Sequence, residues 1–321
     1  MSVGANIRKR RFELRMSQQD LADAMGYKTR STIAKIESGE NDITQKKLEK
    51  FSVVLDTTVE ALITGSVSVS SPIPQVLPES NTGTNRNKNV VIILAGGKSV
   101  RNHQNIPNQF INIHGKPVLV YCLEAYQQHP SVDEIYVVCL KGWEEIVKAY
   151  ADQFGISKLR GLIPAGSSGI LSVKNGLDHI KELYDPEDTL IIQESTRPMV
   201  NVDMISKLLL ACNEKGSATV CQSMRDYVQF SYSDGKAEYV KRDTLVDLQS
   251  PEAHRLSLLE SVFEKAKKQQ HPLTESCCTM LMYNLGYPIN FIEGSINNIK
   301  IVRQEDIAVF NALVFREYTA T

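Results

Sequence analysis

The sequence predicts an α/β protein with a small all-helical domain in front of it. From Val90 onward, short apolar strands alternate with amphipathic helices, which is typical of a mostly parallel sheet with helices on both faces. Before residue 65, apolar residues recur at helical spacing instead. The chain has 321 residues, 42% of them hydrophobic, which is enough for about two domains with buried cores.

Composition limits the possible partners. Lys and Arg total 36 against 37 Asp and Glu, so the net charge of -1 gives no general attraction to nucleic acid or to an anionic membrane. The longest apolar run, residues 90–95, is far shorter than the ~20 residues of a membrane span, and the N-terminus lacks the apolar stretch of a signal peptide. We expect a cytoplasmic protein without membrane contacts. The six cysteines form no C-x-x-C pair, which predicts buried thiols.

A polar segment divides the chain. Residues 66–88 are rich in Ser and Asn, contain three prolines and show no sustained periodicity, so we predict a linker there. The predicted domains are therefore residues 1–65, with a net charge of +2, and residues 89–321; everything after residue 65 carries -3. Five of the 11 basic residues of the small domain belong to its first helix, at positions 8–11 and 15.

The small domain has the pattern of a helix-turn-helix bundle. Helices are predicted over 4–15, 17–25, 29–38, 44–54 and 57–63. Ser17 is a suitable N-cap with Asp20 at the third helical position, and Gly26 suits the left-handed turn that follows. The segment MSQQDLADAMGYKTRSTIAKIESGE, residues 16–40, resembles the helix-turn-helix of the Cro/C1-type (XRE) phage-repressor family.

This resemblance implies DNA binding. Gln18 and Gln19 would meet the DNA backbone at the start of the second helix. The base-facing residues of the third helix would be Thr29, Arg30, Ser31, Thr32 and Lys35, with Ile33 and Ile36 turned inward. One such module reads few base pairs, so we expect a dimer on a pseudo-palindromic operator with half-sites ~34 Å apart. The alternative is that these are solvated charges on a small bundle.

In the large domain, strands are predicted over 90–96, 134–140 and 189–195, and helices over 118–128, 141–154 and 172–183. A Gly-Gly turn follows the first strand directly, where an open α/β sheet places a phosphate-bearing ligand. A tight strand-to-helix turn with Lys98 and Arg101 merely solvated would look the same.

Further motifs strengthen the case for a nucleotide site. They are AGGxxxR (95–101), PNQF (107–110), GKPVL (115–119), AGSSGILSVxNGL (165–177), STRP (195–198), QSPE (249–252) and GSINNIKI (294–301). In this order they resemble the cytidylyltransferases that make CDP-methylerythritol and CDP-ribitol, over residues 89–315. The resemblance implies a Rossmann-like nucleotidyltransferase domain.

The resemblance also implies a reaction and its residues. In that family a sugar-alcohol phosphate attacks the α-phosphorus of CTP, with Mg²⁺ as cofactor and pyrophosphate as the leaving group. Ala95, Gly96, Gly97, Gly166 and Ser172 would hold the nucleotide, while Arg101 and Lys300 would contact the reacting phosphates. The acceptor side would consist of Arg197, Arg242 and Thr274, and the position of the metal-binding aspartate is Glu194.

Six departures fall on the motifs themselves. Asn108 stands where the family has its main cationic lysine, Glu194 replaces an aspartate, and Ser99 replaces a glycine. The others are Glu252 for glutamine, Glu275 for aspartate and Val302 for threonine. Losing one such cation typically costs several kcal/mol of barrier. Lys98 could replace it, although a lysine at another backbone position rarely reproduces a required geometry. We infer a site with lost or altered catalysis.

Residues 226–247 predict a hairpin around the turn Asp234-Gly235. In the resembling enzymes this arm embraces a second subunit and brings the arginine matching Arg242 into its site. We therefore expect a homodimer through a dimerisation hairpin arm, since Val228, Phe230 and Tyr232 would otherwise leave an apolar stripe in water.

Three functions stay open. The first is a transcriptional regulator whose large domain dimerises and binds a cytidine nucleotide, a CDP-polyol or a polyol phosphate. The second is an active CTP-dependent cytidylyltransferase of the ribitol-phosphate or methylerythritol-phosphate type that also binds DNA. The third keeps the large domain only as a dimerisation scaffold. The departures favour the first, and the retained Arg101, Ser172, Arg197 and Lys300 favour the second.

Overall fold

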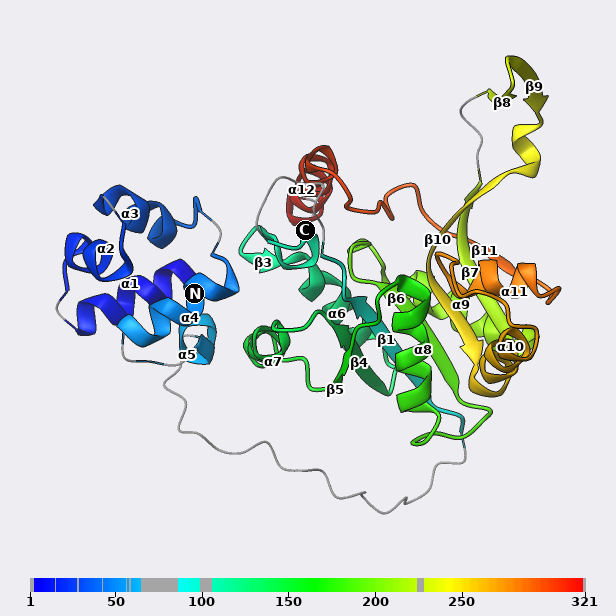
Figure 1. The fold of residues 1–321 in the computed structure, drawn as a ribbon, viewed down its shortest axis with the longest axis horizontal. Helices are drawn as coiled ribbons and strands as arrows, with labels where there is room; N and C mark the ends of the chain where they lie inside the picture. The colour runs from blue at the N-terminus through cyan, green and yellow to red at the C-terminus, as the bar shows by residue number, and fades with distance from the viewer. Residues whose placement is uncertain are drawn as a thin grey trace.

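A computed structural model describes residues 3–14, 16–27, 29–41, 43–55, 57, 59–64, 86–98, 106–223 and 228–319. It contains the predicted combination of a helical bundle and an α/β domain (Figure 1). Residues 66–85, most of the predicted linker, lie outside the described residues. Among the helices of the described segments, none is long and apolar enough to cross a membrane.

The N-terminal bundle has the predicted helices. They are α1 (Val3–Glu13), α2 (Gln18–Met25), α3 (Arg30–Ser38), α4 (Gln45–Val54) and α5 (Val59–Thr64). Ser17 and Asp20 form a capping box at the start of α2, and Gly26 ends it at φ 78°. Ile33, Ile36 and Leu21 are buried between the helices, which confirms the helix-turn-helix geometry.

Contacts between α1 and α3 involve one of the basic residues of the first helix. Arg11 is buried, and its Nε donates to Glu37 of α3 at 2.6 Å. A buried charge needs such a partner. The helices also approach closely at Gly4, where a Cβ would come within 2.1 Å of the Ile36 carbonyl oxygen. α1 and α3 therefore form one tightly joined unit.

The large domain contains a seven-stranded sheet in the order β11-β7-β10-β6-β1-β4-β5. The strands are β1 (Asn89–Ala95), β4 (Glu134–Cys139), β5 (Leu159–Pro164), β6 (Thr189–Glu194), β7 (Ser217–Ser223), β10 (Val246–Arg255) and β11 (Phe291–Glu293). Only β10 runs antiparallel to its neighbours, so the predicted mostly parallel sheet is confirmed. A small ribbon pairs β2 (Asn112–Ile113) with β3 (Lys116–Pro117), after the single turn η1 (Asn108–Phe110).

Helices cover both faces of the sheet. The first core lies under α6 (Val118–Gln128), α7 (Glu144–Gln153), α9 (Val202–Lys215) and α12 (Gln304–Thr319). The second core lies under α8 (Gly169–Ile180), α10 (Leu256–Lys268) and α11 (Cys278–Asn284). Alternate residues of β1 enter the two cores, Val91 and Ile93 the first, Val90 and Ile92 the second. This arrangement leaves the carboxyl ends of the parallel strands free to hold a ligand.

Two predicted helices start at other residues. α8 begins at Gly169 instead of 172, because the Ser168 side chain accepts from the backbone of Leu171 and caps the helix there. α7 begins at Glu144 instead of 141, after a turn whose Gly142 has φ 86°. β5 was not predicted, since its burial does not alternate cleanly along the strand.

The predicted hairpin projects from the sheet, at the upper right of Figure 1. It pairs β8 (Gln229–Ser233) with β9 (Lys236–Val240), followed by the turn η2 (Arg242–Thr244). Asp234 and Gly235 both have positive φ, 51° and 76°, as a two-residue hairpin turn requires. Phe230 and Tyr232 are mostly exposed, at 59% and 75%.

Candidate functional site

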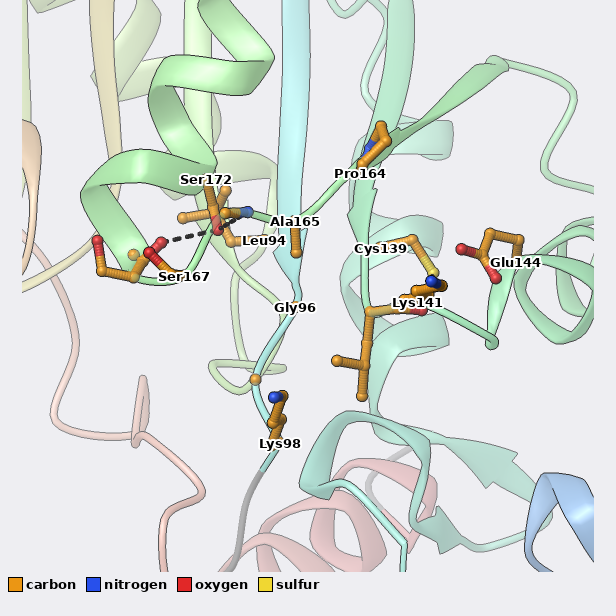
Figure 2. Close-up of a pocket in the computed structure, with 15 residues that line it drawn as sticks. Leu94, Gly96, Lys98, Cys139, Lys141, Glu144, Pro164, Ala165, Ser167 and Ser172 are labelled. Carbon is orange, nitrogen blue, oxygen red and sulfur yellow. Dashed lines mark hydrogen bonds between the residues drawn. The ribbon is translucent and has the colours of Figure 1, made fainter.

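A first pocket of about 900 Å³ opens at the carboxyl ends of β1, β4 and β5 (Figure 2). The Gly-Gly turn after β1 and the β5–α8 loop line it, and the β4–α7 loop closes the other side. Lys98 and Lys141 are the cations on its wall. The pocket therefore offers backbone groups and positive charge together, a combination that suits phosphate.

Two glycines are required by close backbone contacts in this pocket. A Cβ on Gly96 would lie 2.4 Å from the Ala165 Cβ, and one on Gly166 would lie 2.7 Å from the Ser172 backbone nitrogen. The Ser172 hydroxyl accepts from the Gly166 backbone at 3.0 Å and donates to the Ser168 carbonyl. Gly97 has open space around it. Its backbone can therefore be approached by a ligand.

Residues of the PNQF motif hold the backbone segments beside the pocket through hydrogen bonds. The Gln109 side chain is buried and donates to the carbonyl oxygens of Ala95 and Gly97, both at 2.9 Å, which fixes the glycine turn. Asn108 is also buried, and its amide donates to the carbonyls of Ile301 and Val302. The residue that stands in place of the cationic lysine thus holds the neighbouring backbone and brings no charge.

A second pocket of about 330 Å³ adjoins the first and shares Leu94, Gly97 and Gly169 with it. Its polar wall includes Glu194 at the end of β6, together with Arg197 and Lys300. The two pockets therefore adjoin and share part of their lining.

Glu194 pairs with both cations of the second pocket. Its Oε2 lies 3.0 Å from the Arg197 Nε, and its Oε1 accepts from the Lys300 Nζ. Arg197 donates further to the carbonyls of Asn298 and Leu248. The carboxylate therefore neutralises the charges that would attract a phosphate.

This arrangement does not fit a magnesium ligand. Both oxygens of Glu194 already face cations, and the described residues contain no cluster of three His, Cys, Asp or Glu side chains that could hold a metal. Mg²⁺ needs oxygen ligands in near-ideal octahedral geometry at 2.0–2.1 Å. The predicted role of Glu194 as a metal ligand thus stays without structural support.

A buried carboxylate forms the floor of the second pocket. Glu252 accepts from the backbone nitrogens of Cys278 and Thr279, both at 3.0 Å, and from the Thr279 hydroxyl at 2.7 Å. Burial raises its pKa, but the facing His254 and these donors outweigh burial, so the pKa lies below its usual value. Glu252, one of the six departures, is therefore held as an anion at the N-terminus of α11.

Cys277 corrects the expectation that all six cysteines are buried. All six are free thiols, but Cys277 is only partly buried and lines the second pocket. Burial nevertheless raises its pKa to about 11. A thiol with this pKa is a poor nucleophile at neutral pH, so Cys277 belongs to the pocket wall.

The structure brings most of the predicted site residues together. The first pocket contains Gly96, Gly97, Lys98, Gly166 and Ser172, and the second contains Glu194, Arg197 and Lys300. Three predicted residues line neither pocket: Ala95 is buried in β1, Thr274 is exposed, and Arg242 lies beyond the hairpin. Arg101 and Ser99 lie outside the described residues.

Sequence reasoning missed one wall of the first pocket. Lys141 of the β4–α7 loop and Glu144 at the start of α7 line it, and the Glu144 carboxylate accepts from the Gly142 backbone at 2.7 Å. Their position directly after a predicted parallel strand was the available signal, because ligands bind beside such strand ends.

Most of the residues predicted to contact DNA are exposed. Thr29, Arg30, Ser31 and Lys35 are exposed, and Thr32 is half-buried. Gln19 is exposed and donates to Asp23, whereas Gln18 is half-buried and donates to Glu37 at 2.8 Å. The Gln18 amide is thus already engaged inside the bundle.

Comparison with known proteins places both domains. The family model for 2-C-methyl-D-erythritol 4-phosphate cytidylyltransferase matches residues 89–316, more than two thirds of the chain. The chain belongs to this cytidylyltransferase family. A helix-turn-helix model matches residues 7–62, so an XRE-type domain is fused in front of the family domain.

Relatives of the family domain carry two names. A ribitol-5-phosphate cytidylyltransferase of Lacticaseibacillus paracasei is 30% identical over 223 residues, covering 69% of this chain and 95% of the relative. A 2-C-methyl-D-erythritol 4-phosphate cytidylyltransferase of Clostridium botulinum is 33% identical over 221 residues, covering 68% and 94%. The crystal structure of 4-diphosphocytidyl-2C-methyl-D-erythritol synthase from Anaerococcus prevotii aligns at a TM-score of 0.61 with 22% identity, covering 71% and 96%. This last match supports the fold alone.

Proposed function

We propose that the protein is a DNA-binding transcriptional regulator whose cytidylyltransferase-like domain binds a cytidine nucleotide or CDP-polyol and no longer transfers the cytidylyl group. The observation that carries the proposal is the pairing of Glu194 with Arg197 and Lys300. In phosphoryl transfer the protein acts mainly by positioning groups and neutralising charge. This site keeps its shape but lacks the positive charge that transfer requires. Its two cations are paired with Glu194, and Asn108 stands in place of a lysine.

Nucleotide binding is supported by the first pocket. Gly96 and Gly166 keep the close contacts that shape it, and Lys98 supplies a positive charge on its wall. A helix-turn-helix domain with exposed Arg30 and Lys35 supports DNA as the partner of the other domain. An enzyme-derived domain on a DNA-binding domain is suited to reporting the level of its ligand.

The second candidate is an active cytidylyltransferase that also binds DNA. Its support is that Arg197 and Lys300 still line the second pocket beside the nucleotide pocket. In that reaction an acceptor phosphate oxygen attacks the α-phosphorus of CTP, a P–O bond forms, and the bond to pyrophosphate breaks. Magnesium would be held largely by the nucleotide phosphates, as is usual for this ion.

Calorimetry with CTP, followed by a pyrophosphate-release assay on the same sample, separates the candidates. Ribitol 5-phosphate and methylerythritol 4-phosphate serve as acceptors, with Mg²⁺ present. The proposal predicts CTP binding without release above background. Release with either acceptor would establish the second candidate, and absence of CTP binding would leave a dimerisation scaffold.

A further inference from the structure

Helix α7 has two apolar faces. Val147 and Ala151 pack into the first core of the large domain. Ile146 and Ala149, on the other side, are buried in the core of the helical bundle instead. A surface helix of an α/β domain ordinarily has one apolar face. The second face of α7 is therefore explained by the helical bundle that covers it.

The covering element is α5, the last helix of the bundle. Leu62 and Ile63 of α5 are almost fully buried in the same cluster as Ile146 and Ala149. Figure 1 shows α7 at the edge of the large domain that faces α5. The two domains thus meet through an apolar contact, defined here as the α5–α7 interface.

The start of α7 also lines the first pocket. Lys141 and Glu144 line that pocket, and Glu144 is the first residue of the helix. Trp143, between them, stacks on Phe110 with ring centroids 4.1 Å apart, next to the residues that hold the glycine turn. A ligand that rearranges the β4–α7 loop must therefore act on the end of α7.

Contacts between neighbouring helices connect α5 to α3, the helix predicted to read the DNA bases. The Asn6 amide of α1 donates to the carbonyls of Leu62 and Ile63, both at 3.1 Å. α1 in turn is joined to α3 through the buried Arg11–Glu37 pair. Rigid elements in direct contact can transmit a displacement between distant sites.

We propose that the α5–α7 interface couples the two domains, so that a cytidine nucleotide in the first pocket changes the affinity of the helix-turn-helix domain for DNA. This inference rests on the proposed function, since it requires that the chain bind both ligands. Coupling of this kind is reciprocal, and DNA changes the affinity for the nucleotide by the same factor.

The test compares the full-length chain with variants of α7. The probes are CTP and a DNA duplex selected by the wild-type chain from a random-sequence library. Ile146→Glu places a charge in the apolar interface, Ile146→Ala removes part of its contact, and Glu145→Gln changes an exposed side chain of the same helix. In the wild type and Glu145→Gln, saturating CTP should change the DNA dissociation constant about 5–150-fold.

Both Ile146 variants should still bind each ligand alone, but CTP should change their DNA affinity much less, and Ile146→Glu should lose the effect. Retained binding of each ligand also shows that both domains are folded. Full coupling in the Ile146 variants, or a wild type that binds both ligands without coupling, would overturn this inference alone. A wild type that fails to bind CTP or DNA would overturn the proposed function as well.

Discussion

Glu194 is one methylene longer than the aspartate that the resembling enzymes have at this position, and the structure shows what this length does. The carboxylate reaches Arg197 and Lys300 at the same time. It is an anion fixed where two cations would otherwise face a phosphate. Its side chain is 29% exposed, so each ion pair is partly screened by water and is worth about 1 kcal/mol or less.

Replacing Glu194 by Gln should free both cations. We expect the affinity for ribitol 5-phosphate, measured by calorimetry, to rise about fivefold, which corresponds to about 1 kcal/mol. Glu187→Gln is the matched control, because Glu187 also pairs with an arginine, Arg255, but lines neither pocket. A lower affinity in Glu194→Gln, or an equal rise in the control, would contradict the inferred role of Glu194.

Glu252 predicts a pH dependence of stability. Its folded-state pKa lies below the ordinary value of 4.5, so its stabilising contribution is complete above pH 4.5 and is lost as the pH falls through the folded-state pKa. Glu252→Gln should cost about 1–3 kcal/mol at neutral pH, because buried donors lose their acceptor.

The difference in unfolding free energy between wild type and Glu252→Gln should therefore narrow below pH 4.5. Urea unfolding followed by the fluorescence of Trp143 measures it, since this single tryptophan packs in the large domain. A difference that stays constant down to pH 3 would mean that Glu252 does not titrate with folding.

At the scale of elements, helix α3 exposes Arg30 and Lys35, two of the residues predicted to contact bases. The double variant Arg30→Ala and Lys35→Ala should abolish specific DNA binding, each lost base contact costing about 1–3 kcal/mol. Lys267→Ala with Lys268→Ala removes the same charge from exposed positions on α10 and should leave binding unchanged. Electrophoretic mobility shifts with the selected duplex measure both. Unchanged affinity in the α3 variant would show that another surface contacts DNA.

Much of this fold was predictable from local signals. The capping box at Ser17, the glycine at position 26 and the buried run of β1 are short-range patterns, and each forms the expected element. The start of α8 was missed by three residues because Ser168, an ordinary serine in the sequence, supplies the cap. β5 was missed because an edge strand needs only one buried neighbour and shows little periodicity.

The sequence motifs indicated residues of the two pockets but not their pairings. Gly96, Gly166 and Lys300, which were chosen from the motifs, line the pockets. The motifs did not indicate that Glu194 would pair with both Arg197 and Lys300. Glu194 and Lys300 are 106 positions apart in the sequence and meet only through the tertiary fold. The second apolar face of α7 could not be predicted either. In the sequence, a helix that is apolar on two sides looks the same as a helix buried in a single core.

At the scale of the whole molecule, the hairpin arm predicts the oligomeric state. Phe230 and Tyr239 pack edge to face on the arm, 6.0 Å between ring centroids, yet both are more than half exposed. We expect them to be covered in a homodimer, which would supply the two-fold symmetry that a palindromic operator requires.

Phe230→Ser with Tyr239→Ser should convert the dimer into a monomer in sedimentation velocity, and DNA affinity should fall at least tenfold because only one half-site is held. Leu183→Ser is the control, an exposed apolar residue away from the arm. If the arm variant stays dimeric, or if the wild type is a monomer, the arm is not the dimer interface.

The central claim is that the site lost its chemistry through particular substitutions while it kept its shape. The most direct measurement is pyrophosphate release from CTP by the wild type and by the variant Asn108→Lys with Glu194→Asp, assayed side by side with ribitol 5-phosphate and Mg²⁺. We expect no release above background from the wild type and measurable release from the variant, because one cation is restored and the carboxylate at position 194 regains the length that it has in the resembling enzymes. Release by the wild type at the rate of the variant or faster would contradict the claim.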